Sequence, residues 1–200
     1  MNFKLICFYI SFLLIVINCN GSESKEIQII DKALGFSMNL PEGFQKLDQE
    51  ETNKAVNLGK KKLKKLYDVD IDMSDMKPNI FKKDEENYFI LSIKDYNVEI
   101  DGDYKHAVAE YNIQLYTAYR KNFITAEIDT LTSYGKIDNV DFTKFSVSID
   151  IPHKAKMEVV SYNTYIKNKD FSASIVYLDK DIGEEMVNAI KSAKFKKTAL

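Results

Sequence analysis

The most constraining feature of this 200-residue sequence is a run of four strand-like segments near its C-terminal end. They span residues 126–137, 140–151, 157–167 and 171–178, and each is rich in β-branched and aromatic residues. The connections between them are short, and two of them contain Asn and Asp, which favour tight turns. Strands joined in this way pair antiparallel with their neighbours in sequence, so we predict a four-stranded meander.

Three amphipathic helices are predicted beside this meander. One begins at Asp48, because Glu51 follows three residues later as in a capping box. A second covers residues 104–119 with its apolar side chains on one face, and a third begins at Asp181 with another capping-box pattern. Strands at residues 27–30, 36–40 and 87–94 complete the order ββ-α-β-α-ββββ-α, and residues 95–103 are predicted to be a polar loop.

This order of elements predicts an α+β fold. Helices and sheet must bury their apolar sides against each other, so we expect an antiparallel sheet of about six to seven strands covered by helices. Hydrophobic residues make up 45% of the chain and charged residues 29%, which is typical of a globular protein. We therefore expect a single domain over residues 27–197.

Two stretches resemble the PsbP-like or Mog1-like family of α/β/α sandwiches. The first is residues 35–44, GFSMNLPEGF, in which a strand is followed by Pro, Gly and an aromatic residue. The second is the strand at residues 171–177 together with residues 189–195, AIKSAKF. The resemblance extends over most of residues 35–195. It implies an α/β/α sandwich that acts by binding partners, and it names no catalytic residue, so we do not expect an enzyme.

The first 26 residues resemble a bacterial export signal. Residues 5–17 are apolar over the length of a signal-peptide core, shorter than the roughly 20 residues that span a membrane. Residues 16–19, VINC, resemble a lipobox, which implies a signal peptide over residues 1–18, lipidation of Cys19 and a polar tether over residues 19–26. Two alternatives stay open: cleavage after Gly21, which would release a secreted protein, and an uncleaved N-terminal helix.

Composition excludes several classes of chemistry. Cys7 and Cys19 are the only cysteines, so residues 20–200 cannot hold a disulfide, a thiolate zinc site or a cysteine nucleophile. Lys and Arg number 28 against 30 Asp and Glu, and Arg120 is the only arginine, so nucleic acid is not an expected partner. No cofactor is expected. His106 and His153 belong to no recognisable metal or catalytic motif.

Two acidic stretches resemble the start of an EF-hand loop. Residues 68–72, DVDID, lack the glycine that turns such a loop. The second stretch has Gly102 but lacks the final acidic ligand, and its candidate ligands are Asn97, Glu99, Asp101 and Asp103. Solvated acidic loops are the favoured interpretation, and no metal is expected.

The helix that begins at Asp48 has a basic coat. Its flank and outer face carry Lys60, Lys61, Lys62, Lys64 and Lys65. These lysines could contact anionic lipid if the chain is tethered to a membrane, although charge runs on helices usually keep an outer face hydrated.

Together these features predict an exported bacterial lipoprotein of the cell envelope, held by its lipid at the outer membrane or cell surface. The predicted role is a non-enzymatic binding or adaptor module for a protein partner. The alternative is a secreted or periplasmic small-ligand binder or hydrolase whose pocket the sequence does not reveal.

Overall fold

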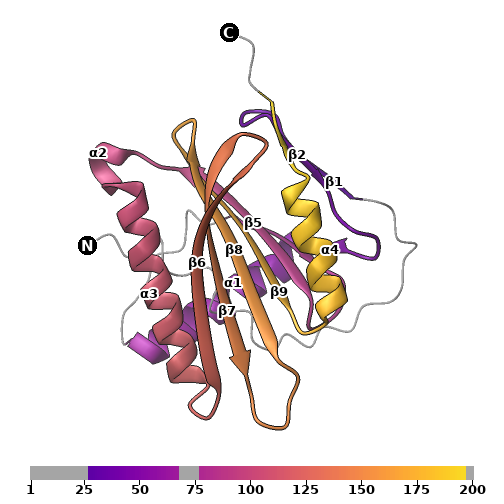
Figure 1. The fold of residues 1–200 in the computed structure, drawn as a ribbon, viewed down its shortest axis with the longest axis vertical. Coiled ribbons are helices and arrows are strands. Elements are labelled where there is room, and N and C mark those ends of the chain that lie inside the picture. The colour runs from indigo at the N-terminus through magenta and orange to yellow at the C-terminus, as the bar shows by residue number, and fades with distance from the viewer. Residues whose placement is uncertain (1–26, 68–76, 197–200) are drawn as a thin grey trace.

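The structure is a computed structural model that describes residues 27–67 and 77–196. Its main sheet has seven antiparallel strands in the order β3-β4-β5-β9-β8-β7-β6 (Figure 1). The strands are β3 (Gln45–Lys46), β4 (Asn79–Lys82), β5 (Tyr88–Asp95), β6 (Glu127–Ile137), β7 (Val140–Asp150), β8 (Met157–Ile166) and β9 (Lys169–Tyr177). Strands β6 to β9 pair in sequence order, which confirms the predicted meander.

A second, three-stranded sheet has the order β1-β2-β10 and comprises β1 (Gln28–Asp31), β2 (Phe36–Asn39) and β10 (Lys194–Phe195). The strands predicted at residues 27–30 and 36–40 therefore form their own sheet with the C-terminal strand instead of joining the main one. Gly35 permits the close approach of the backbone at residue 196. It has a φ of +71°, its carbonyl accepts a hydrogen bond from the Lys196 N–H, and a Cβ atom there would collide with the Lys196 backbone.

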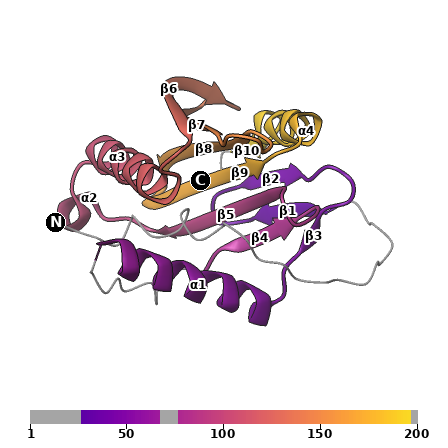
Figure 2. The same ribbon diagram turned by 90° about the horizontal axis from the view of Figure 1, so that it is seen from below.

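The described chain has four helices, α1 (Gln49–Tyr67), α2 (Val98–Asp101), α3 (Tyr104–Asn122) and α4 (Lys180–Lys191), of which α1, α3 and α4 pack on the main sheet. Helices α3 and α4 lie on opposite sides of the long strands (Figure 2). One apolar core joins α1 and α3 to one face of the sheet, and a second joins α4 and the small sheet to the other face. The predicted α+β class and helix-covered antiparallel sheet are thus confirmed.

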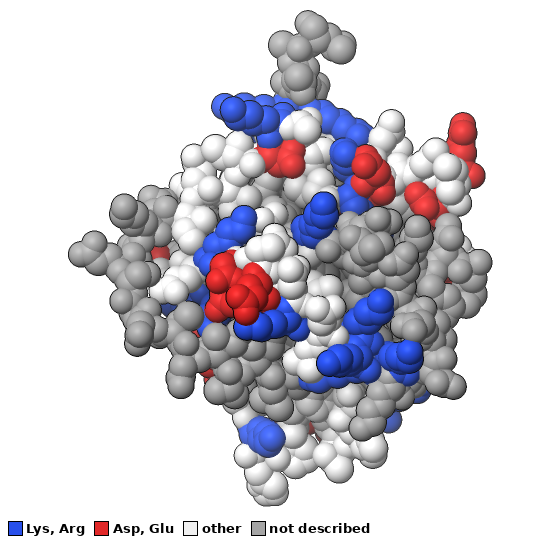
Figure 3. Space-filling model, turned by 180° about the vertical axis from the view of Figure 1, so that it is seen from behind, with Lys and Arg blue, Asp and Glu red and all other residues white. Residues whose placement is uncertain are grey.

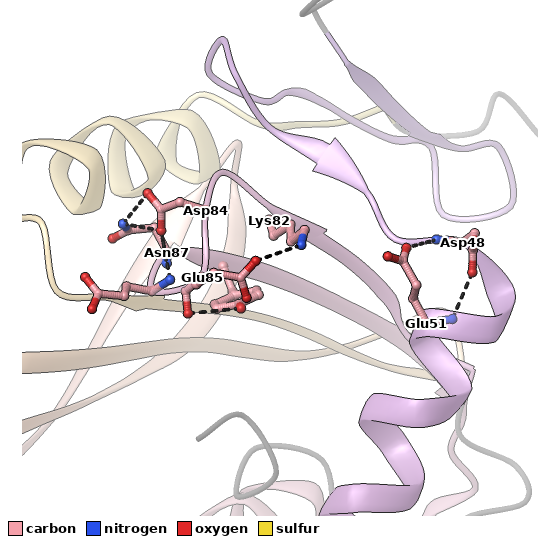
Figure 4. Close-up of polar contacts among 8 residues, drawn as sticks. Asp48, Glu51, Lys82, Asp84, Glu85 and Asn87 are labelled. Atoms are coloured by element: carbon pink, nitrogen blue, oxygen red, sulfur yellow. Dashed lines mark hydrogen bonds and ion pairs between the residues drawn. The ribbon is translucent and has the colours of Figure 1, made fainter. Parts of the chain in front are cut away.

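Helix starts are set by side-chain caps. The Asp48 N–H donates to Glu51 Oε2 at 3.0 Å, and the Glu51 N–H donates to Asp48 Oδ1 at 2.8 Å, which confirms the predicted capping box (Figure 4). The start predicted for the last helix is wrong by two residues. Asp179, not Asp181, is its N-cap, and its side chain accepts from two backbone N–H groups.

The prediction missed the shortest elements. Strands β3, β4 and β10 hold two to four residues, too few for a two-residue alternation to be recognised. The predicted loop at residues 95–103 contains the one-turn helix α2, which Asn97 caps by accepting a hydrogen bond from the Glu99 N–H.

The β4–β5 hairpin is tied to α4 by a buried amide. Asp84 accepts hydrogen bonds from the Asn87 backbone N–H and from Asn87 Nδ2, while Lys82 pairs with Glu85 at 3.2 Å (Figure 4). Asn87 Oδ1 in turn accepts from the backbone N–H groups of Leu178 and Asp179. The turn of one hairpin therefore positions the start of α4.

Candidate binding groove between α3 and β6

A groove of about 340 Å³ lies between α3 and the outer strands of the meander. One stripe of α3 forms one wall, and β6 and β7 form the other wall and the floor. The lining residues are Lys105, Val108, Ala109, Asn112, Ile113, Tyr116, Thr130, Thr132, Tyr134, Thr143 and Phe145. We call this feature the α3–β6 groove.

The wall of the groove exists because α3 has apolar residues on more than its core face. Val108, Tyr111 and Leu115 are buried against the sheet. Ile113 and Tyr116 lie off that stripe, and Ile113 is 65% exposed. Helical spacing places Ile113 and Tyr116 on the flank that faces β6, together with Asn112.

Three exposed apolar side chains, those of Ile113, Tyr116 and Tyr134, lie together in the groove. In the described part of the chain, eight large apolar side chains are exposed, and seven of them lie between residues 98 and 134. They are Val98, Ile100, Ile113, Tyr116, Ile124, Leu131 and Tyr134. Scattered exposed apolar residues need no explanation, but the grouping of Ile113, Tyr116 and Tyr134 in one groove is typical of an interaction surface.

A row of polar side chains crosses the sheet beneath α3 and ends in the groove. Directly opposite positions on neighbouring strands place Ser92 beside Ser172, Ser172 beside Asn163, Asn163 beside Thr143, and Thr143 beside Tyr134. Ser172 donates to Asn163 Oδ1 at 2.8 Å. The two residues at the outer end, Thr143 and Tyr134, line the groove. The polar row therefore reaches the groove at its outer end.

Two buried amides near the groove each have one polar atom without a partner among the described residues. Asn112 is 6% exposed, and its Oδ1 accepts no hydrogen bond from any residue that the structure describes. Asn163 Nδ2, one strand further into the sheet, likewise finds no acceptor among the described residues. Most buried polar groups are hydrogen-bonded, so these two unpaired atoms are exceptions in the described chain.

The N-terminal end of α3 is held to the sheet by the buried carboxylate of Asp170. Tyr104 donates to Asp170 Oδ1 at 2.8 Å, and Lys94 Nζ lies 3.6 Å from Asp170 Oδ2. Burial raises the pKa of Asp170, and the positive charge of Lys94 and the Tyr104 hydrogen bond oppose that rise. Rings of Tyr96 and Tyr165 pack against Tyr104, so this cluster fixes α3 in place.

Several predicted site residues lie outside the described residues. These are Cys19, the acidic stretch at residues 68–72, and the side chain of Lys65. Of the other lysines on α1, Lys61 and Lys64 are exposed while Lys60 and Lys62 are half-buried, and burial lowers the pKa of Lys62. In the view from behind, the blue Lys and Arg side chains fall into several separate groups, some of them beside acidic side chains (Figure 3).

The four candidate calcium ligands are engaged as helix caps or exposed. Asn97 caps α2, Asp101 Oδ2 accepts from the Asn97 N–H at 2.9 Å, and Asp103 Oδ1 accepts from the His106 N–H at 2.8 Å. Glu99 is exposed. Across residues 27–67 and 77–196, no three His, Cys, Asp or Glu side chains gather where they could hold a metal ion.

The two histidines are not brought together. His106 lies in the first turn of α3 and pairs with Glu110, whereas His153 lies in the loop between β7 and β8 at the other end of the sheet (Figure 1).

Among the described helices, none is long and apolar enough to cross a membrane.

Sequence analysis did not identify the groove, although one signal was available. Ile113 and Tyr116 are apolar residues off the core stripe of their helix, and such residues can mark a second contact surface. The sequence does not predict that Tyr134 and Thr143 line the groove, because their positions depend on how the strands pair.

Comparisons with known proteins support the fold. No family model and no curated protein matches the sequence. Among solved structures, cyanobacterial PsbP (CyanoP) from Synechocystis sp. PCC 6803 is similar, with a TM-score of 0.56 and 9% sequence identity, over 90% of this chain and 99% of that chain. At this identity the likeness concerns architecture alone, and on that evidence the chain has a PsbP-like α+β fold.

Proposed function

We propose that this protein is an exported, lipid-anchored envelope protein that binds a protein partner through the α3–β6 groove. The observation that carries the proposal is a groove lined by the exposed side chains of Ile113, Tyr116 and Tyr134, with the buried amide of Asn112 in its helical wall. Protein interfaces combine an apolar or aromatic centre with a few directed polar groups, and Ile113, Tyr116, Tyr134 and Asn112 provide both.

The lining of the groove favours binding over catalysis. Lys105 is the only charged residue among its lining residues. General acid–base chemistry needs at least one titratable group held against the reacting atoms, usually with a partner that tunes its pKa. A single exposed lysine at the rim instead favours a partner that carries a carboxylate near that end.

The envelope location of this proposal comes from the leader sequence. A lipid on Cys19, followed by a short polar tether, would hold the folded domain close to a membrane surface. In that setting the groove would meet envelope proteins, and the lysines of α1 could contact anionic headgroups. The absence of a strong positive field agrees with a protein partner instead of nucleic acid.

Photocrosslinking in living cells of the native host tests the groove. A photoreactive phenylalanine analogue at Ile113 should crosslink to an envelope protein, because this side chain is exposed and lines the groove. The matched control is Ile30, which is 57% exposed but lies on β1 in the small sheet. A chain that carries the analogue at Tyr116 together with Ile113→Lys should form no crosslink to that envelope protein.

Equal crosslinking from Ile113 and Ile30 would contradict a specific groove. The anchor is tested separately in the same strains by labelling with a clickable palmitate analogue. Label should appear in the wild-type chain and be lost in Cys19→Ala. A mature chain without label that begins near Ser22 would rule out the lipid anchor but leave the groove proposal intact.

A further inference from the structure

The outer edge of the main sheet is unusually long. Strand β6 forms that edge and has 11 residues, whereas the edge strand β3 at the other end has 2. In the small sheet, the edges β1 and β10 have 4 and 2 residues. No strand of the described chain lies beyond β6 (Figures 1 and 2). Proteins usually keep edge strands short because their free N–H and C=O groups pair with other chains.

Strand β6 also lacks the usual protection at its centre. Its charges are Glu127 and Asp129 near the start and Lys136 near the end. Residues 130–135, TLTSYG, carry no charge and no proline. Leu131 and Tyr134 in this stretch are 63% and 77% exposed. Charge or proline at the centre is what normally prevents edge-to-edge pairing, so the edge is open to another strand.

We propose that this edge pairs antiparallel with β6 of a second copy of the chain, about a two-fold axis at Leu131. A two-fold axis perpendicular to the sheet keeps equivalent faces together, so opposed residues must face the same side of the sheet. Leu131 then opposes Leu131 of the second copy. Thr130 opposes Thr132 and Ile128 opposes Tyr134, each pair occurring twice.

The charge pattern selects this register. With the axis at Leu131, Glu127 opposes Gly135 and Asp129 opposes Ser133, so no like charges face each other. Moving the axis to Thr132 would place Ile128 opposite Lys136. Moving it to Thr130 would place Asp129 opposite Leu131. Only the Leu131-centred register matches the apolar residues of the strand with one another and leaves its charges unopposed.

This pairing would join two binding grooves. Thr130, Thr132 and Tyr134 lie on the face of β6 that lines the groove with α3. Because equivalent faces stay together, the same side chains of the second copy would continue the floor. The result is one surface with an α3 helix on each side, in which each copy contributes Tyr134 next to Ile128 of the other. The pairing is independent of which partner the groove binds.

Disulfide trapping of the full chain, purified in mild detergent, tests the register. Cys7→Ala and Cys19→Ala remove the native thiols, and single cysteines are then placed at Leu131, Tyr134 or Ile30. Directly opposed residues have Cα atoms at a distance that a disulfide can bridge. Leu131→Cys should form its disulfide at least about ten times faster than Ile30→Cys, which can crosslink only through random collisions. The reason is that strand pairing holds the two sulfurs of Leu131→Cys at a high effective concentration. Tyr134→Cys should match the control, because its two copies lie six residues apart along the strands, about 20 Å.

Sedimentation of the wild-type chain and two variants gives an independent measurement. The wild type should have twice the monomer mass, and Leu131→Lys should have the monomer mass because it places like charges on the axis. Ile30→Lys should keep the dimer. A monomeric wild type with no excess crosslinking at Leu131 would overturn the proposal, and fastest crosslinking at Tyr134 would overturn the Leu131-centred register. Neither outcome bears on the Ile113 photocrosslink.

Discussion

At the scale of single residues, buried polar groups distinguish the α3 side of the sheet. Asn112, Asn163 and Asp170 all lie beneath or beside α3, where most residues of a small domain would be apolar. Asp170 has its hydrogen bond and a nearby cation, while one polar atom of each asparagine has no partner in the described chain. The two amides therefore bear on the proposed binding role, whereas the Asp170 carboxylate bears on the stability of the fold.

Asp170 should make stability depend on pH in an unusual direction. Because burial raises its pKa in the folded chain above the ordinary value of 3.8, the folded state binds more protons than the unfolded state above that pH. Wild-type stability relative to Asp170→Asn should therefore fall as the pH rises from 3.8 through the raised pKa. Urea denaturation of both proteins across this range measures the difference. A constant difference would show that Lys94 and Tyr104 balance burial, and one that grows in favour of the wild type would show that they outweigh it.

At the scale of elements, helix starts follow local chemistry closely. The capping box of α1 consists of two reciprocal hydrogen bonds between Asp48 and Glu51. It satisfies backbone N–H groups that no residue inside the helix can reach. These contacts are close in sequence, which is why Asp48 was recognisable before the structure was known.

Asp48→Ala should lower the free energy of unfolding by about 1 kcal/mol, since it removes the acceptor for the Glu51 N–H. Glu50→Ala is the matched control in the same turn. It loses only an exposed ion pair with Lys54, so the expected change is a few tenths of a kcal/mol, roughly 0.3. Urea denaturation of the three proteins gives both values. Equal losses in the two variants would mean that the capping hydrogen bonds contribute nothing special to α1.

At the scale of the whole molecule, an aromatic cluster joins the small sheet to the main one. Phe195 on β10 lies 5.1 Å from Phe36 on β2 and 5.4 Å from Phe171 on β9, measured between ring centroids. Phe142 on β7 is 5.6 Å away. Four strands that are distant in sequence meet at this point, so the C-terminal strand closes the core on the α4 side.

Phe195→Ala should lower the free energy of unfolding by about 3 kcal/mol, because it removes a buried ring and leaves a cavity among three others. The control is Ile124→Ala, a side chain that is 83% exposed at the turn before β6, with an expected change within about 0.5 kcal/mol. Thermal and urea denaturation measure both. A small effect of Phe195→Ala would mean that β10 contributes little to the stability of the main sheet.

The groove shows how far a site can be anticipated from sequence. Its helical wall could have been suspected from Ile113 and Tyr116, whose positions are fixed by the local geometry of a helix. Its floor could not, because Thr143 meets Tyr134 and Asn163 only through strand pairing. Asn112 looks like an ordinary polar residue in the sequence, and its lack of a partner emerges only when the sheet is in place.

The sequence by itself determined the meander, the three long helices and the α+β class, because turns, caps and apolar periodicity act between residues a few positions apart. Only the tertiary structure decided that β1 and β2 leave the main sheet to pair with β10, and that Gly183 must be glycine because a Cβ atom would overlap the ring of Tyr177. It also decided that β6 is a bare edge beside a groove. These features depend on contacts between distant segments, and local patterns carry no information about which distant segments meet.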